Sequence, residues 1–216
     1  MDSGVGEGVT RVRRVLSDRA ERATTQLMMT LAAHRRWRRT PHIPFGRLVV
    51  LRGPTAPRTI EHFTLPHLAA VGEEFARAAL LEASEPLMPR DNDLLGWAWD
   101  RAENQAEQWA GVEDGWTKWH KIPIKGESRY ITFKGVVDAR NAIVHGLGHL
   151  TRKQTRGDGG AKVRASLALV GITTVGRKLE ISDDSILTCV DAAREFIVWL
   201  DGQSVGKGLR PLRSAL

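Results

Sequence analysis

The chain has 216 residues, a length that suits one domain with a substantial core, or one domain with an appendage. Hydrophobic residues make up 42% of it, yet no apolar run approaches the ~20 residues of a membrane-spanning helix. The N-terminus lacks the apolar core of a signal peptide, and the single cysteine, Cys189, excludes an internal disulfide. We therefore expect a cytoplasmic protein in which Cys189 is a small core residue.

The net charge of +7 is unevenly distributed along the chain. Residues 11–39 contain nine arginines against Asp18 and Glu21, a local balance of +7 that leaves the remainder of the chain close to neutral. A basic segment on a neutral body favours a polyanionic partner, and RNA is the partner that we expect.

Residues 1–60 are predicted to form a basic helix followed by a proline-rich linker. Apolar residues recur at helical spacing over residues 9–34, and Pro41 ends the element. Four prolines indicate that residues 41–60 are a linker with at most one short strand. The cationic end of the helix is either a solvated C-terminus or an RNA-binding segment, with arginines on phosphates and a tryptophan stacked on a base. The candidate RNA-binding residues are Arg35, Arg36, Trp37, Arg38 and Arg39.

Two further helices are predicted before the middle of the chain. One covers residues 64–83 with Thr64 as its N-cap. The next is rich in tryptophan and covers residues 91–120, where Gly111 or Gly115 could divide it. Its tryptophans favour packing in the core and at a dimer interface over base stacking. They are Trp97, Trp99, Trp109, Trp116 and Trp119.

The second half of the chain is predicted to contain two helices and one β-hairpin. A helix over residues 130–153 precedes a flexible loop over 154–162. Residues 163–173 and 178–181 predict the two strands of the hairpin, around a Val-Gly-Arg turn. Ser182 then caps a last amphipathic helix.

Together these elements predict a mainly α fold. Residues 61–203 form a helical bundle with a small β-hairpin before its last helix. The basic N-terminal helix precedes this domain, and a basic tail over residues 204–216 follows it.

The most informative residues lie within the predicted helix over 130–153. Its run Val-Val-Asp-Ala-Arg-Asn-Ala-Ile-Val-His-Gly-Leu-Gly-His contains Arg140, Asn141, His145 and His149. At about 100° per residue, Asn141, His145 and His149 share one helix face, and Arg140 lies on the adjoining flank. A fixed cation and a base that titrates near neutral pH suit chemistry on a phosphodiester.

This run resembles the signature of the HEPN family, an arginine, four to six residues and a histidine, with a polar residue after the arginine. The stretch Ala-Arg-Asn-Ala-Ile-Val-His-Gly-Leu-Gly is most similar to the RiboL-PSP-HEPN branch. The resemblance covers residues 61–203 and implies an all-helical domain. It also implies a metal-independent ribonuclease of a toxin or antiphage defence system, with no cofactor. Family members that are silenced by adenylylation carry a tyrosine where this chain has Leu147.

The chemistry that this resemblance implies is RNA cleavage by internal transfer. His145 would act as general base on the ribose 2′-OH or as acid on the leaving 5′-oxygen. Arg140 would grip the phosphate and stabilise the transition-state charge, while Asn141 would orient the phosphate or His145. Attack by the 2′-OH predicts a 2′,3′-cyclic phosphate product. Because one histidine cannot easily act as both acid and base, the family places two motifs across an interface, and we expect a homodimer.

Other interpretations remain open. Arg140 and His145 could be ordinary surface residues. His145 and His149 have the spacing of two zinc ligands on a helix, but no third ligand is evident nearby in sequence, so we expect no metal; His149 would instead support RNA binding. Gly146 and Gly148 indicate either a close approach of backbones or a weakened helix. The domain could also be a non-catalytic HEPN module that binds RNA, nucleotide or a partner protein, or a subunit controlled by an antitoxin or phage-derived regulator.

Overall fold

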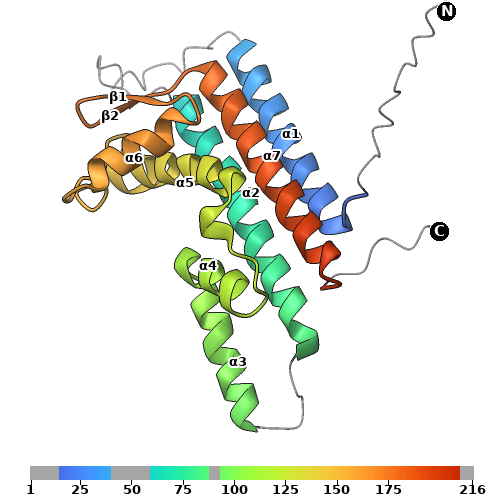
Figure 1. The fold of residues 1–216 in the computed structure, drawn as a ribbon. Coiled ribbons are helices and arrows are strands. Elements are labelled where there is room, and N and C mark those ends of the chain that lie inside the picture. The colour runs from blue at the N-terminus through green and yellow to red at the C-terminus, as the bar shows by residue number, and fades with distance from the viewer. Residues whose placement is uncertain (1–14, 40–58, 88–92, 210–216) are drawn as a thin grey trace, which may run out of the picture.

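The computed structural model describes residues 15–39, 59–87 and 93–209. In these residues the chain forms seven α-helices, two short 3-10 helices and a two-stranded antiparallel hairpin that precedes the last helix (Figure 1). A mainly helical fold with a small hairpin in this position was predicted and is confirmed. In chain order the elements are α1 (Asp18–Arg39), α2 (Thr59–Ser84), η2 (Glu85–Leu87), α3 (Asp93–Ala106), α4 (Trp109–Lys118), η3 (Ile124–Gly126), α5 (Ser128–Gly146), α6 (Gly159–Ala168), β1 (Thr173–Val175), β2 (Lys178–Glu180) and α7 (Asp183–Gly206).

The long helices α1, α2 and α7 pack side by side (Figure 1). Buried residues of α1 recur at helical spacing, so one apolar stripe faces α2 and α7; they are Ala20, Ala23, Leu27, Leu31 and His34. The helix ends at Arg39, before Pro41 as predicted, and His34 near its end is buried against Thr64 of α2. It begins at Asp18, since residues 15–17, which the prediction placed within the helix, are not helical. Residues 9–14 and most of the predicted linker, residues 41–58, lie outside the described residues.

The helix α2 begins at Thr59, one turn before the predicted start at Thr64. Thr64 is not a cap, since its hydroxyl donates to the Ile60 carbonyl at 2.9 Å within the helix and contacts His34 Nδ1 at 3.0 Å. The prediction missed the first turn because its signals, Thr64 followed by Pro66, resemble a helix start although both residues lie inside the helix.

The tryptophan-rich helix is divided into α3 and α4, as the glycines suggested. The break between the two helices lies just before Gly111. An added Cβ at this position would lie 1.9 Å from the Gln105 carbonyl oxygen, so only glycine allows the start of α4 to approach the end of α3 this closely. Trp116 is fully buried and its indole N–H donates to the Ala76 carbonyl at 3.0 Å, which confirms the predicted core packing for this residue. Trp109 packs edge-on against Phe133.

Two predictions about the second half of the chain are wrong. The motif helix α5 ends at Gly146 rather than at 153, because Leu147 and Gly148 adopt positive φ angles of 52° and 85°. Residues 159–168, predicted as loop and strand, form the helix α6. Of the first predicted strand, residues 163–173, only Thr173 lies in a strand: β1 covers Thr173–Val175 and pairs with Lys178–Glu180.

The last helix begins as predicted. Ser182 caps α7 in a capping box with Ser185, whose backbone N–H donates to the Ser182 hydroxyl at 3.1 Å. Cys189 is buried in the core as expected, and burial raises the pKa of its thiol to about 12.

Of the predicted tail, residues 204–206 belong to α7, and 210–216 lie outside the described residues. No helix among the described residues has the length and apolar character needed to span a membrane.

Candidate functional site

The helix α5 is held between two neighbours that approach it closely. On the α6 side, a Cβ on Gly135 would lie 2.2 Å from the Ser166 carbonyl oxygen. The Ser166 hydroxyl also donates to Asp138 Oδ2 at 2.6 Å. On the α2 side, the Phe133 ring occupies the space beside Gly72, where a Cβ would lie 2.5 Å from the ring. Together with the packing of α7 against α5, these contacts leave only a strip of the α5 surface accessible.

The motif residues lie along this strip. Asn141 and Arg140 are half-buried, and His145 and Val144 are exposed. The Arg140 Nη1 donates to Asn141 Oδ1 at 2.9 Å. Because Asn141 and His145 are one helical turn apart, this hydrogen bond turns the guanidinium toward the face that carries the imidazole. The structure therefore brings the arginine and the polar residue together and leaves the histidine open to solvent.

A carboxylate of α2 lies within electrostatic reach of Arg140. Burial raises the pKa of Glu73, and the positive charge of Arg140 opposes that rise. The guanidinium thus lies near an acidic side chain of α2 and is hydrogen-bonded to the amide of Asn141.

His149 does not continue the helical stripe as predicted. Because α5 has already ended, this residue forms an isolated β-bridge with Lys178 of β2, and both side chains are exposed. His62 of α2 lies close to both: burial lowers its pKa most, the nearby Glu61 opposes this, and the charges of His149 and Lys178 lower it further. The His62 ring also packs against Gly148, where a Cβ would lie 2.6 Å from its Cε1 atom.

The cationic end of α1 is exposed but partly engaged in ion pairs. Arg38 Nη2 lies 2.7 Å from Asp183 Oδ2, and its Nη1 lies 3.7 Å from Glu61 Oε1. The Glu61 carboxylate is 1% exposed and has no hydrogen-bond partner among the described residues. Trp37 is 69% exposed and available for stacking. The remaining candidates in this segment, Arg35, Arg36 and Arg39, are also exposed.

The two predicted RNA-binding regions meet at the start of α2. Arg38 of α1 approaches Glu61, and the turn after the motif helix packs on the adjacent His62. Sequence reasoning missed His62 and Lys178, since both are distant in sequence from the motif and have no local pattern that marks them. Within the described residues, no three His, Cys, Asp or Glu side chains gather as metal ligands.

Comparison of the chain with protein-family models, curated proteins and solved structures gives no match. A function for this protein is therefore inferred from the motif and from the geometry that surrounds it.

Proposed function

We propose that this protein is a metal-independent endoribonuclease of the HEPN type, acting in a toxin or antiphage defence system. The observation that carries the proposal is the 2.9 Å bond from Arg140 Nη1 to Asn141 Oδ1 on the same accessible strip as His145. A half-buried arginine and an exposed histidine five residues apart on one helix provide an anion ligand and a proton-transfer group, the pair that phosphodiester cleavage needs.

The reaction that these residues support is attack by the ribose 2′-OH on the adjacent phosphorus. Either His145 accepts the 2′-OH proton or it donates a proton to the leaving 5′-oxygen. Arg140 stabilises the charge that accumulates on the phosphoryl oxygens, and Asn141 holds the guanidinium in place. The products are a 2′,3′-cyclic phosphate and a 5′-hydroxyl.

A homodimer would supply the second histidine, and the surface next to His145 has properties that suit such an interface. Val144 and Leu147 flank this histidine and are 48% and 83% exposed. Leu147 also has a φ angle of 52°, a region that costs a side-chain-bearing residue about 1–2 kcal/mol. If a second copy covers this exposed leucine, its apolar surface is buried next to both motifs, and that burial stabilises the dimer.

The decisive experiment compares RNA cleavage by the wild type, Arg140→Ala, Asn141→Ala and His145→Ala in excess EDTA. Loss of the histidine should lower the cleavage rate by about 10²–10⁴-fold, the usual contribution of positioned proton transfer. Arg129→Ala is the matched control, since it removes an exposed arginine from the first turn of the same helix. Mass spectrometry of the fragments should show 2′,3′-cyclic phosphate ends.

Equal cleavage by all four proteins, or linear 3′-hydroxyl ends, would contradict the proposal. If none of the proteins cleaves RNA but the wild type binds RNA, nucleotide or a partner protein, the non-catalytic HEPN module is the better interpretation.

A further inference from the structure

A group of cations lies at the end of the molecule where α5 stops, α6 begins and the hairpin turns (Figure 1). Residues 151–180 hold seven lysines and arginines against Asp158 and Glu180, a local balance of +5. The near-neutral body of the chain therefore contains a strongly basic segment. We call its six exposed cations without a carboxylate partner the basic arm: Arg152, Lys153, Arg156, Lys162, Arg164 and Arg177.

In the part of the chain that the structure describes, no carboxylate pairs with a cation of the basic arm. Within the described residues, the side chains of Arg152, Lys153, Arg156 and Lys162 make no hydrogen bond or ion pair. Arg164 donates to the Thr174 hydroxyl and the Gly176 carbonyl, both of which are neutral acceptors. This contrasts with α1, where Arg19 and Arg38 lie within 2.9 Å of carboxylate oxygens.

Backbone hydrogen bonds fix the hairpin part of the basic arm next to the motif, and α6, which carries Lys162 and Arg164, packs against α5. The Leu150 N–H donates to the Arg177 carbonyl at 2.7 Å, and the Leu179 N–H donates to the Gly148 carbonyl at 2.8 Å. The Arg177 Nε also donates to the Leu150 carbonyl at 2.9 Å. The hairpin is thus attached to the residues that directly follow His145, so its cations cannot move independently of the motif.

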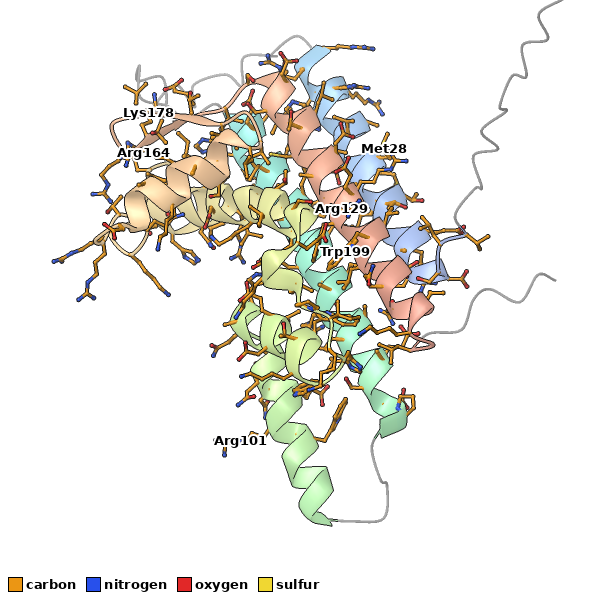
Figure 2. All side chains as sticks on the ribbon, viewed as in Figure 1. Met28, Arg101, Arg129, Arg164, Lys178 and Trp199 are labelled. Carbon is orange, nitrogen blue, oxygen red and sulfur yellow. The ribbon has the colours of Figure 1, made fainter. Side chains whose placement is uncertain are left out.

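The side chains at this end extend into solvent. Figure 2 shows Arg164 and Lys178, from α6 and β2, at the same end of the molecule, where long side chains tipped with nitrogen project outward. Cations on a loop, a helix and a hairpin that share one end of the molecule match the spaced phosphates of a polynucleotide better than a single small anion.

We propose that the basic arm binds the backbone phosphates of the RNA strand whose scissile linkage occupies Arg140 and His145. This inference rests on the proposed ribonuclease function and adds a binding surface to it. Arg177 and the loop after α5 would contact the phosphates nearest to the motif, and Arg156 and Lys162 would contact those further along the strand. Contacts of this type are independent of base sequence.

The test measures binding of a fluorescein-labelled single-stranded RNA by anisotropy, in a His145→Ala background that prevents cleavage. Arg156→Gln combined with Lys162→Gln removes two unpaired cations of the arm. Each phosphate contact on single-stranded RNA contributes about 0.7 to the slope of log affinity against log salt, so the slope should fall by about 1.4. At about 0.1 M salt this corresponds to about 25-fold weaker binding. Arg22→Gln combined with Arg194→Gln is the control, since it removes the same charge from exposed positions of α1 and α7.

Equal weakening by the two double variants would overturn the basic arm as an RNA surface and leave only a general charge effect. Binding to vesicles that contain phosphatidylserine, without binding to RNA, would also overturn it in favour of a membrane partner. The ribonuclease proposal fails separately, if the unsubstituted protein leaves RNA intact while the basic arm still binds it. Matching thermal unfolding curves for the two double variants establish that both are folded.

Discussion

Two side-chain-bearing residues among the described part of the chain occupy the left-handed backbone region, and they differ in their surroundings. Leu147 has a φ angle of 52° and ends the motif helix, while Lys121 has a φ angle of 56° after α4. Both are exposed, so neither conformation is enforced by burial of the side chain. A lysine in such a position is at least well solvated, whereas a leucine exposes apolar surface next to His145 without compensation from the protomer.

Replacing each residue by glycine relieves the same backbone strain, but only the replacement of Leu147 should change function. Leu147→Gly and Lys121→Gly should each raise the free energy of unfolding by up to about 1 kcal/mol, since relief of strain is partly offset by the greater entropy of glycine in the unfolded chain. Only Leu147→Gly should weaken self-association, measured by sedimentation equilibrium, and lower RNA cleavage with it. Unchanged association and cleavage in Leu147→Gly would remove this residue from the proposed interface.

The contact between α5 and α6 depends on the absence of one side chain. Gly135 lets the two helices approach until its Cα faces the Ser166 carbonyl, a rigid backbone group that cannot move aside. The neighbouring Asp138 accepts hydrogen bonds from both Ser166 and Lys134, so the same contact satisfies a buried carboxylate. The position of the strip that carries the motif follows from this close approach.

Gly135→Ala should therefore lower the free energy of unfolding by roughly 1–3 kcal/mol, the usual cost of forcing extra volume into a packed site. Gly206→Ala is the control because its Cβ would meet nothing within 4 Å, and alanine favours the helix by up to about 1 kcal/mol. Chemical denaturation distinguishes the two variants. If both change stability in the same direction, the distance between α5 and α6 is not set by Gly135.

The helix α6 shows why some elements could not be predicted from the sequence. Alternating apolar residues at 163, 165, 167 and 169 indicated a strand, yet the buried residues are Gly160, Val163, Ser166 and Leu167, which have helical spacing. Ser166 is polar, and its closest hydrogen-bond acceptor is Asp138 of α5, a long-range partner that no local pattern reveals. The cap of α7 at Ser182 was predictable because the signal and the partner are local.

The same distinction applies to the candidate site. Arg140, Asn141 and His145 could be found because they lie within one helical turn and a half of each other. His62 and Lys178 could not, because they approach His149 only when α2 and β2 pack around the end of α5. Likewise, the charge of the basic arm is visible in the sequence, but its attachment next to the motif depends on the pairing of Leu150 with Arg177.

At the scale of the whole molecule, two neutral histidines, His62 and His120, connect helices that are far apart in the sequence. His62 connects the start of α2 to the turn after α5. His120 Nε2 lies 2.7 Å from the Ser84 hydroxyl at the end of α2, and its carbonyl accepts from Lys207 Nζ at 3.1 Å beyond α7. Burial is the main cause that lowers the pKa of each, and the charge of Lys207 adds to this at His120.

These shifts predict that the protein loses stability in mild acid. Because both pKa values lie below the ordinary 6.5, the unfolded chain takes up protons first as the pH falls through that value. The free energy of unfolding should be constant above about pH 7.5 and decrease toward about pH 5.5, which urea denaturation can follow. The lowered pKa of Asp183 also makes stability fall on acidification, but only near and below its ordinary pKa of 3.8, outside this pH window. The raised pKa of Glu73 has the opposite sign, since the folded state then takes up its proton first and acidification adds stability.

Removing the two titrating groups should flatten this dependence on pH. The double variant His62→Gln with His120→Gln is expected to start from a lower stability at neutral pH, since both residues are packed, but to lose less of it on acidification. His67→Gln, which removes an exposed histidine of α2, is the control and should retain the slope of the wild type. A double variant with an undiminished slope would show that other groups link proton binding to unfolding. In that case neutral His62 would not stabilise the contact between the start of α2 and the turn after α5. Neutral His120 would likewise not stabilise the contact between the ends of α2 and α7.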